Sequence, residues 1–440
     1  MLYFEGSLML LNKDLIFTAL NQLWKLISGP LLLLVVPLYL TPEEQGYWYT
    51  FSSLAALAIM ADLGFSTIIL QFAAHEFAYL SFDKKNNIVG NEFHLKKLAT
   101  FFIFCLKWAT CIVLIVFPII LCIGFYLLSQ QQTAMQWHIP WLLYGIASGL
   151  MFLNSSILFF LEGCSSVARI QKLRLKVSIV MTLFMFGGLI FQFKLYALSL
   201  SLLGGALCSF GLIYRSFGIT IKQLIAVSKT YTYSWKKEFL SLIWRYAISW
   251  ASGYFIFQIY TPLTFQIHGA IAAGKVGISI ALWTAVFSLA NTWISAIIPK
   301  LNIYIEKKEW KLLDKVFYKN LLLSIMTFSI GVIIVFLVIH IFKGRLAIID
   351  RFVSNISMMF LAINWFLQII INTLAVYLRA HKEEPLVLFS FSSALYISVT
   401  TFLCIVYLPI DYLFVGYFSS YLFALPWIFS IFNKKRKTHL

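Results

Sequence analysis

Charge is scarce in this sequence, and negative charge is scarcer still. Only 12% of the 440 residues are charged, and 17 Asp and Glu stand against 34 Lys and Arg. A soluble domain has about a quarter of its residues charged, so a soluble protein is excluded. With 61% hydrophobic residues and a mean hydropathy of +0.87, the composition predicts an all-α polytopic membrane protein.

Cysteine is also sparse and is placed without a pattern. The six cysteines fall mostly inside apolar segments, and the sequence contains no CxxC pair. This spacing excludes a disulfide framework and a cysteine metal site, so we interpret them as small core residues. The segment 1–8 resembles the remnant of a protease site from a cloning tag, so we exclude it from functional interpretation.

Long apolar windows divide the chain into about twelve segments of membrane-spanning length. The expected spans are 14–40, 47–70, 98–126, 139–161, 177–193, 195–214, 239–266, 275–298, 316–342, 352–375, 386–407 and 412–432. Only Lys194 separates the fifth from the sixth, which predicts a tight hairpin between these two spans. We expect six-helix bundles at 1–214 and 239–440, joined by a basic cytoplasmic linker at 215–238.

The basic residues collect on one side of these expected spans. With the N-terminus inside, the outer side carries only Lys194, Lys275, Lys343, Arg345 and Arg351, which leaves 29 of the 34 on the inner side. This bias follows the positive-inside rule and predicts that both termini are cytoplasmic. It accounts for the net charge of +17 through topology and anionic lipid, without a nucleic-acid partner.

Four cations lie within or at the rim of expected spans: Lys25, Lys107, Arg245 and Lys275. Charge at bilayer depth is costly, so it either faces a wet cavity and marks a site or reaches the interface by snorkelling. Lys25 and Arg245 precede similar patterns, Ser28-Gly29 with Pro37 and Ser252-Gly253 with Pro262. Gly/Pro-interrupted helices at matching positions of two halves are a pointer to a transporter site. We therefore expect Lys25 and Arg245 to bind an anion, with Lys107 as a third member and Lys275 as an interface anchor.

Other polar residues within the spans suggest further site members. Asn364, Gln368 and Asn372 are spaced four apart, which places them on one face of a helix. They either line a polar cavity or form interhelical hydrogen bonds. Asp62 and Glu162 are candidates for proton or sodium coupling, with helix-end ion pairing as the alternative.

Several short motifs carry a resemblance to a known family. The stretch Tyr39-Leu40-Thr41-Pro42-Glu43-Glu44-Gln45-Gly46-Tyr47-Trp48 and the segments 61–66, 71–76 and 379–385 resemble Wzx-type O-antigen flippases. The motifs cover about a tenth of the chain, whereas the twelve-span layout covers all of it. The resemblance implies the multidrug/oligosaccharidyl-lipid/polysaccharide exporter superfamily, whose members form two six-helix bundles arranged as a V around a central cavity.

The resemblance also implies a function. Such flippases move undecaprenyl-diphosphate-linked oligosaccharide from the inner to the outer leaflet of the bacterial cytoplasmic membrane, during lipopolysaccharide biosynthesis. The implied partners are this lipid-linked sugar and membrane lipids, together with association with a polysaccharide polymerase and chain-length proteins. No cofactor is expected, and the energy comes either from proton or sodium coupling or from the membrane potential alone.

Two alternatives stay open. A multidrug antiporter of the same superfamily favours anions in its cavity, whereas the charges within these spans are mostly cations. A membrane glycosyltransferase or polymerase needs acidic residues, often with a metal, on a sizeable outer loop. The outer acids are only Glu43, Glu44, Asp350 and Asp411, on short loops, and neither a DxD nor an HExxH motif is present. The sequence therefore favours a transporter over an enzyme.

Overall fold

The computed structural model describes residues 2–62, 64–131, 134–235, 247–248, 251–381 and 386–437. Within these ranges, side chains are described except those of residues 2–15, 25, 59–61, 299 and 306. Arg245 and residues 382–385 of the motif at 379–385 therefore lie outside the described residues.

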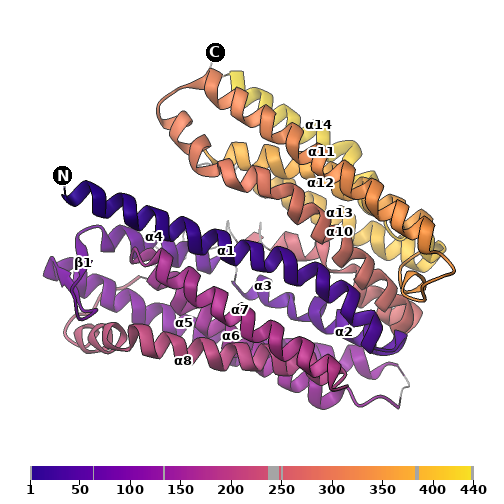
Figure 1. Cartoon of the computed structure of the whole chain (residues 1–440), viewed down its shortest axis with the longest axis horizontal. Helices are drawn as coiled ribbons and strands as arrows, with labels where there is room; N and C mark the ends of the chain where they lie inside the picture. The colour runs from indigo at the N-terminus through magenta and orange to yellow at the C-terminus, as the bar shows by residue number, and fades with distance from the viewer. Residues whose placement is uncertain are drawn as a thin grey trace. The chain divides into compact units, whose positions relative to one another are not determined.

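Helices make up nearly all of the chain (Figure 1). The N-terminal part contains α1 (Leu2–Tyr39), α2 (Pro42–Ala55), α3 (Leu57–Asp62), α4 (Phe65–Phe77), β1 (Leu80–Phe82), β2 (Ile88–Gly90), α5 (Glu92–Ser129), α6 (His138–Gly163), α7 (Val167–Ile190) and α8 (Leu195–Ser228). The C-terminal part contains α10 (Tyr260–Glu306), α11 (Trp310–Phe342), η1 (Ile349–Arg351), α12 (Asn355–Arg379), α13 (Val387–Tyr407), η2 (Ile410–Tyr412) and α14 (Val415–Lys437). The predicted all-α membrane architecture is confirmed, with one short hairpin added.

Ten helical stretches among the described residues are long and apolar enough to cross a membrane. Two differences from the expected twelve have local causes. The expected span 47–70 is divided into α2, α3 and α4, and Gly64 takes a left-handed φ of 74° before α4. The expected seventh and eighth spans join in one stretch, Ala251–Ile305, interrupted at Gly269, whose φ is 84°.

The tight hairpin expected around Lys194 is present. Helix α7 ends at Ile190 and α8 begins at Leu195, and both Gln192 and Lys194 have positive φ angles between them. Helix α8 then continues to Ser228, so much of the segment expected to be a linker is helical.

The chain divides into two compact units. The N-terminal unit comprises Met1–Ser28 and Leu54–Ala247, and the C-terminal unit comprises Gly29–Ser53 and Ile248–Leu440. The divisions therefore fall inside α1 and near the end of α2, so residues 29–53 belong to the second unit.

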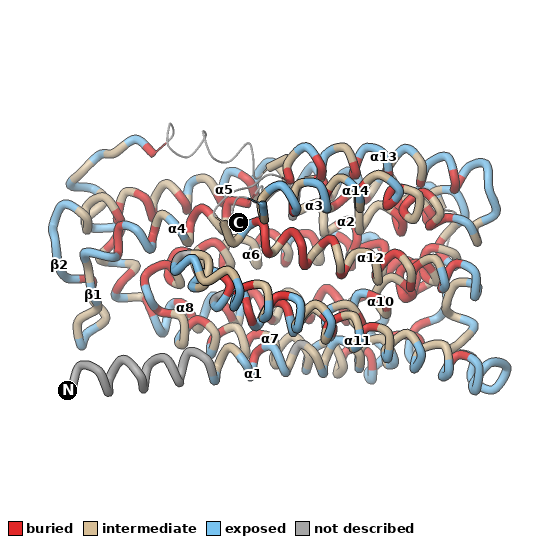
Figure 2. Tube along the Cα trace, turned by 90° about the horizontal axis from the view of Figure 1, so that it is seen from above, coloured by how far each residue is buried: buried red, intermediate tan, exposed pale blue. Residues whose placement is uncertain are grey.

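In the N-terminal unit, α8 packs along both α6 and α7, and α5 packs against α6. Its core is rich in aromatic rings, such as Phe101, Phe102, Phe160 and Trp235, each at most 2% exposed. Buried and exposed residues alternate along these helices, as the colours of Figure 2 show. The exposed positions are mostly apolar, for example Leu114, Phe184 and Phe210, as expected for helices that face lipid.

The β1–β2 hairpin is held against this unit by side chains from two helices. Gln223 of α8 accepts from Ile88 N at 2.7 Å and donates to Ile88 O at 2.8 Å. Thr220 donates to the carbonyl of Asn86, and Arg169 of α7 donates to the Asn86 side chain. The hairpin is therefore tied to α7 and α8.

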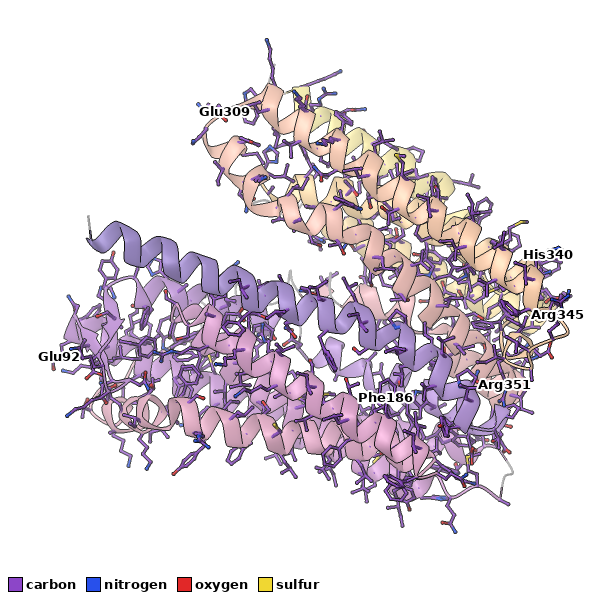
Figure 3. The ribbon with its side chains drawn as sticks, viewed as in Figure 1. Glu92, Phe186, Glu309, His340, Arg345 and Arg351 are labelled. Atoms are coloured by element: carbon purple, nitrogen blue, oxygen red, sulfur yellow. The ribbon has the colours of Figure 1, made fainter. Side chains whose placement is uncertain are left out.

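In the C-terminal unit, α2 packs closely on α10. A Cβ added at Gly46 would lie 1.9 Å from the carbonyl oxygen of Ala270, so only glycine allows this approach. Gln45 donates to Gly274 O at 2.9 Å, and Arg351 donates to Leu40 O at 3.1 Å. Figure 3 shows Glu309 at one end of α11 and His340 near the other, so α11 runs the length of this unit.

Candidate functional site

The C-terminal unit contains a cavity of about 450 Å³. Its walls come from residues 253–258, α10, α12, α13 and α14. The lining residues are Gly253, Ile256, Phe257, Gln258, Ile280, Thr284, Phe287, Ser288, Trp365, Gln368, Ile371, Asn372, Ala375, Arg379, Leu386, Phe389, Ser390, Ser393, Ile397, Tyr417, Ser420, Tyr421 and Ala424. Mostly apolar walls with a few convergent polar groups are typical of ligand sites, and the volume lies in their usual range.

The three amides predicted on one face of a helix are all on α12, and two of them line this cavity. Gln368 Oε1 accepts from Tyr417 Oη at 3.2 Å and from Tyr421 Oη at 3.3 Å. Asn372 donates to Asn291 Oδ1 of α10 at 2.8 Å. Both alternatives left open by the sequence therefore hold at once, because these amides line the cavity and also bond between helices.

Asn364 differs from the other two amides. It is fully buried, donates to Phe414 O at 3.2 Å, and is absent from the residues that line the cavity. Its own carbonyl accepts from Tyr421 Oη at 2.7 Å. Asn364 therefore connects α12 to the start of α14 and positions Tyr421 beside the cavity.

Among the described lining residues, Arg379 is the only Lys, Arg, Asp or Glu. It is the last residue of α12, beside the segment that leads into α13. A guanidinium presents a planar set of donors that matches carboxylate or phosphate oxygens. The described lining of this cavity therefore carries one positive side chain and no negative one.

Aromatic rings form the apolar part of the cavity wall. Phe257 stacks on Trp365 with ring centroids 5.7 Å apart and an interplanar angle of 16°. Phe287 packs against the same indole at 4.9 Å, and Tyr417 stacks on Tyr421 at 5.3 Å. Flat ring faces beside hydroxyl and amide groups suit a ligand with both apolar faces and hydroxyls, as sugars have.

Of the three cations predicted to bind an anion, only the side chain of Lys107 is among those that the structure describes. Lys25 lies in α1, but its side chain is outside the described set, as is the whole of Arg245. Lys107 is exposed on α5. Their proposed anion-binding role therefore stays a prediction.

The two candidate coupling acids are engaged in local contacts. Asp62 accepts from the hydroxyl of Ser66 at 2.6 Å and from its backbone N–H at 3.3 Å. Glu162 pairs with Arg174 at 2.7 Å and accepts from Gln171 at 3.2 Å. Gln171 in turn accepts from Asn21 of α1 at 3.1 Å, so Glu162 belongs to a polar network that joins α1, α6 and α7.

Lys275, expected to be an interface anchor, lines a second cavity of about 630 Å³ in the C-terminal unit. His268, Lys343, Asp350 and Asp411 also line it, so charges of both signs meet there. Because the signs are mixed, this cavity favours no ligand charge as clearly as the first one does.

Sequence reasoning missed several residues of the first cavity. Arg379 follows an expected span on its inner side, where the positive-inside rule already accounts for a basic residue. Tyr417, Tyr421 and Trp365 are indistinguishable from the other aromatics of the chain before the helices are placed. A signal did exist for Thr284 and Ser288, which are spaced four apart on one face of α10.

Comparison with known proteins establishes the fold. No family model matches the sequence, and no curated protein matches it. Among solved structures, the chain is similar to an inward-facing multidrug resistance MATE family transporter of the MOP superfamily. The TM-score is 0.61 and the sequence identity is 12%, and the match covers 97% of this chain and 99% of the other. The outward-facing conformation of such a transporter matches with a TM-score of 0.55 and 11% identity over 97% and 96%.

A MOP superfamily transporter from Pyrococcus furiosus is similar as well. Its TM-score is 0.55, with 13% identity over 97% of this chain and 94% of the other, and the reverse polarity of its binding pocket suggests a different function for it. These likenesses extend over nearly the whole chain. The chain therefore has the fold of MATE transporters of the MOP superfamily.

Proposed function

We propose that this protein is a flippase that carries undecaprenyl-diphosphate-linked oligosaccharide across the bacterial cytoplasmic membrane by alternating access. The observation that carries the proposal is the polarity of the C-terminal cavity. Its described lining combines amides, hydroxyls and aromatic rings with one cation, Arg379, and includes no Asp or Glu. A sugar head linked to a diphosphate needs these groups, because it loses water on leaving the aqueous phase.

The multidrug antiporter is the second candidate, supported by its shared fold. A cationic drug is stabilised by anionic side chains, yet the described lining of the C-terminal cavity offers only a guanidinium charge. The two cargoes therefore predict opposite responses to added negative charge.

Complementation tests this proposal. A strain that lacks its own flippase, and whose polysaccharide matches this protein's cargo, is expected to regain surface polysaccharide with the wild-type chain. Arg379→Gln is expected to reduce rescue at least tenfold, because a charge-assisted contact to the diphosphate is lost. Lys25→Ala and Arg245→Ala test the remaining predicted cations in the same strain.

Arg345→Gln, in the loop after α11, is the matched control and is expected to rescue fully at equal protein level. If Arg379→Gln, Lys25→Ala and Arg245→Ala all rescue fully, the cationic site is wrong. If Arg379→Glu instead increases resistance to cationic drugs, the antiporter is the better assignment.

The membrane potential alone can supply the driving force. Moving negative charge outward, across a membrane that is negative inside, gains about 2.3 kcal/mol per charge per 100 mV. A diphosphate carrying two charges gains about twice that. In proteoliposomes without an ion gradient, collapsing the potential is expected to abolish net transport, and undiminished transport would show that another energy source is used.

A further inference from the structure

A second, apolar groove of about 310 Å³ lies on the C-terminal unit, beside the polar cavity. Six apolar residues line most of it: Ile248, Ala251, Phe255, Phe391, Ala394 and Leu395. Its two remaining lining residues are Ser252 and Ser398. Their hydroxyls bond to Ile248 O and Ala394 O, each at 2.7 Å. The groove therefore presents apolar surface to whatever occupies it.

The groove and the cavity share two walls. In the helical segment 251–257, residues 251, 252 and 255 line the groove, whereas residues 253, 256 and 257 line the cavity. In α13, residues 391, 394, 395 and 398 line the groove, whereas residues 389, 390, 393 and 397 line the cavity. Both sets follow the helical repeat, so these two helices separate the polar cavity from the apolar groove.

Small residues lie where the helical segment 251–257 and α13 face each other, a region that we call the seam. Ala251, Ser252 and Gly253 follow one another in the first, and Ser393 and Ala394 are adjacent in the second. A Cβ added at Gly253 would meet no atom within 4 Å, so the space beside it is open. Ser393 is 4% exposed, lines the cavity, and its Oγ has no hydrogen-bond partner among the described residues. A ligand group in the seam would satisfy this hydroxyl.

From this arrangement we infer that the groove binds the polyisoprenyl chain of the carrier while the cavity binds its sugar head. The diphosphate then passes through the seam between segment 251–257 and α13. The inference rests on the proposed function and adds a binding site for the lipid tail. The polyisoprenyl chain then stays in an apolar environment, and the sugar head stays among polar groups. Neither the transfer of the lipid tail into water nor the transfer of the head into hydrocarbon is needed.

Photolabelling tests the inference on the full-length protein in lipid nanodiscs. The probe is undecaprenyl diphosphate with a diazirine on the chain and no sugar. A phosphatidylglycerol with the same diazirine on an acyl chain is the comparison. We expect the carrier probe to label 248–255 and 391–398 preferentially, and the phospholipid to label the exposed face of α13 without that preference.

Ala394→Phe fills the groove and is expected to reduce its labelling about tenfold. Val399→Phe is the matched control, because Val399 is 52% exposed on the same helix and is not among the groove residues. It is expected to label like the wild type. If Ala394→Phe does not yield folded protein, Ala251→Leu fills the groove from the other wall and is expected to act in the same way.

Three results would overturn the inference: equal labelling of the groove by the phospholipid, unchanged labelling in folded Ala394→Phe, or label spread evenly along α13. The probe carries no sugar, so its labelling does not depend on transport. Preferential labelling of the groove without rescue of surface polysaccharide rejects the proposed function alone. Rescue with scattered labelling rejects the groove alone.

Discussion

The paired acids of the N-terminal unit and the polar cavity of the C-terminal unit show two different arrangements of polar groups. In the N-terminal unit, charged side chains pair with one another: Glu76, 3% exposed, contacts Lys97 and His94 at 2.8 Å each, and Glu162 contacts Arg174. In the C-terminal unit, uncharged amides and hydroxyls surround a cavity with one described cation, Arg379. Paired charges are satisfied by the protein itself, whereas a cavity with a polar lining has room for a ligand. We therefore expect the paired charges to contribute to stability and the cavity residues to contribute to ligand binding.

Glu76→Gln tests the first half of this comparison and is expected to have the largest effect. Glu76 is buried, and the substitution removes the carboxylate charge that both Lys97 and His94 contact, so the free energy of unfolding is expected to fall by about 3–5 kcal/mol. Thermal unfolding in detergent or nanodiscs measures it. Glu92→Gln is the matched control, because Glu92 is 78% exposed in its pair with Lys96. Water and salt screen that exposed pair, so its loss is expected to leave the free energy of unfolding nearly unchanged. Equal losses in the two variants would contradict the assignment.

Gly46→Ala tests packing within the C-terminal unit. The added methyl group would overlap the carbonyl of Ala270, so α2 and α10 must separate, at a cost of about 1–3 kcal/mol. Gly29→Ala in α1 is the control. Its added Cβ meets nothing within 4 Å, and alanine favours the helix by about 1 kcal/mol. Thermal unfolding of the two variants is expected to shift in opposite directions, and a shift of the same sign would contradict the close approach of α2 and α10.

Glu162→Gln tests whether Glu162 stabilises the fold or couples transport to protons or sodium ions. Its ion pair with Arg174 predicts a loss of about 1–3 kcal/mol of stability, with transport per folded protein unchanged at every pH. Transport of the lipid-linked sugar in proteoliposomes, measured across pH, is the readout. A variant that is fully stable but has lost its pH dependence would identify Glu162 as a coupling residue instead.

Asn364→Leu and Asn372→Leu compare two amides on one face of α12. Asn364 is fully buried, so its replacement removes the hydrogen bond that ties α12 to Phe414 O and is expected to cost about 1–2 kcal/mol of stability. Asn372 lines the cavity, so its replacement is expected to change stability by less than about 1 kcal/mol and to weaken cargo binding several-fold. Thermal unfolding and binding of the lipid-linked sugar measure the two effects. Equal effects on binding would show that the amides act as one set.

Much of the fold could be predicted from the sequence, because long apolar segments predict membrane-spanning helices. The hairpin at Lys194 was predicted correctly for this reason. The break of the second span was not, because a left-handed Gly64 between Asp62 and Ser66 has no hydropathy signal. In the candidate site, the spacing of Gln368 and Asn372 predicted a shared face. The pairing of α12 with the tyrosines of α14 depends on tertiary packing, which spacing does not encode.

The hairpin held by Gln223 has a consequence for association between molecules. A two-stranded ribbon offers unpaired backbone groups to any strand that approaches, and such edges promote aggregation. At Ile88 the side-chain amide of Gln223 meets both the N–H and the carbonyl, so one residue takes the place of a third strand. A single glutamine thus blocks one backbone position of an edge that would otherwise favour association between molecules.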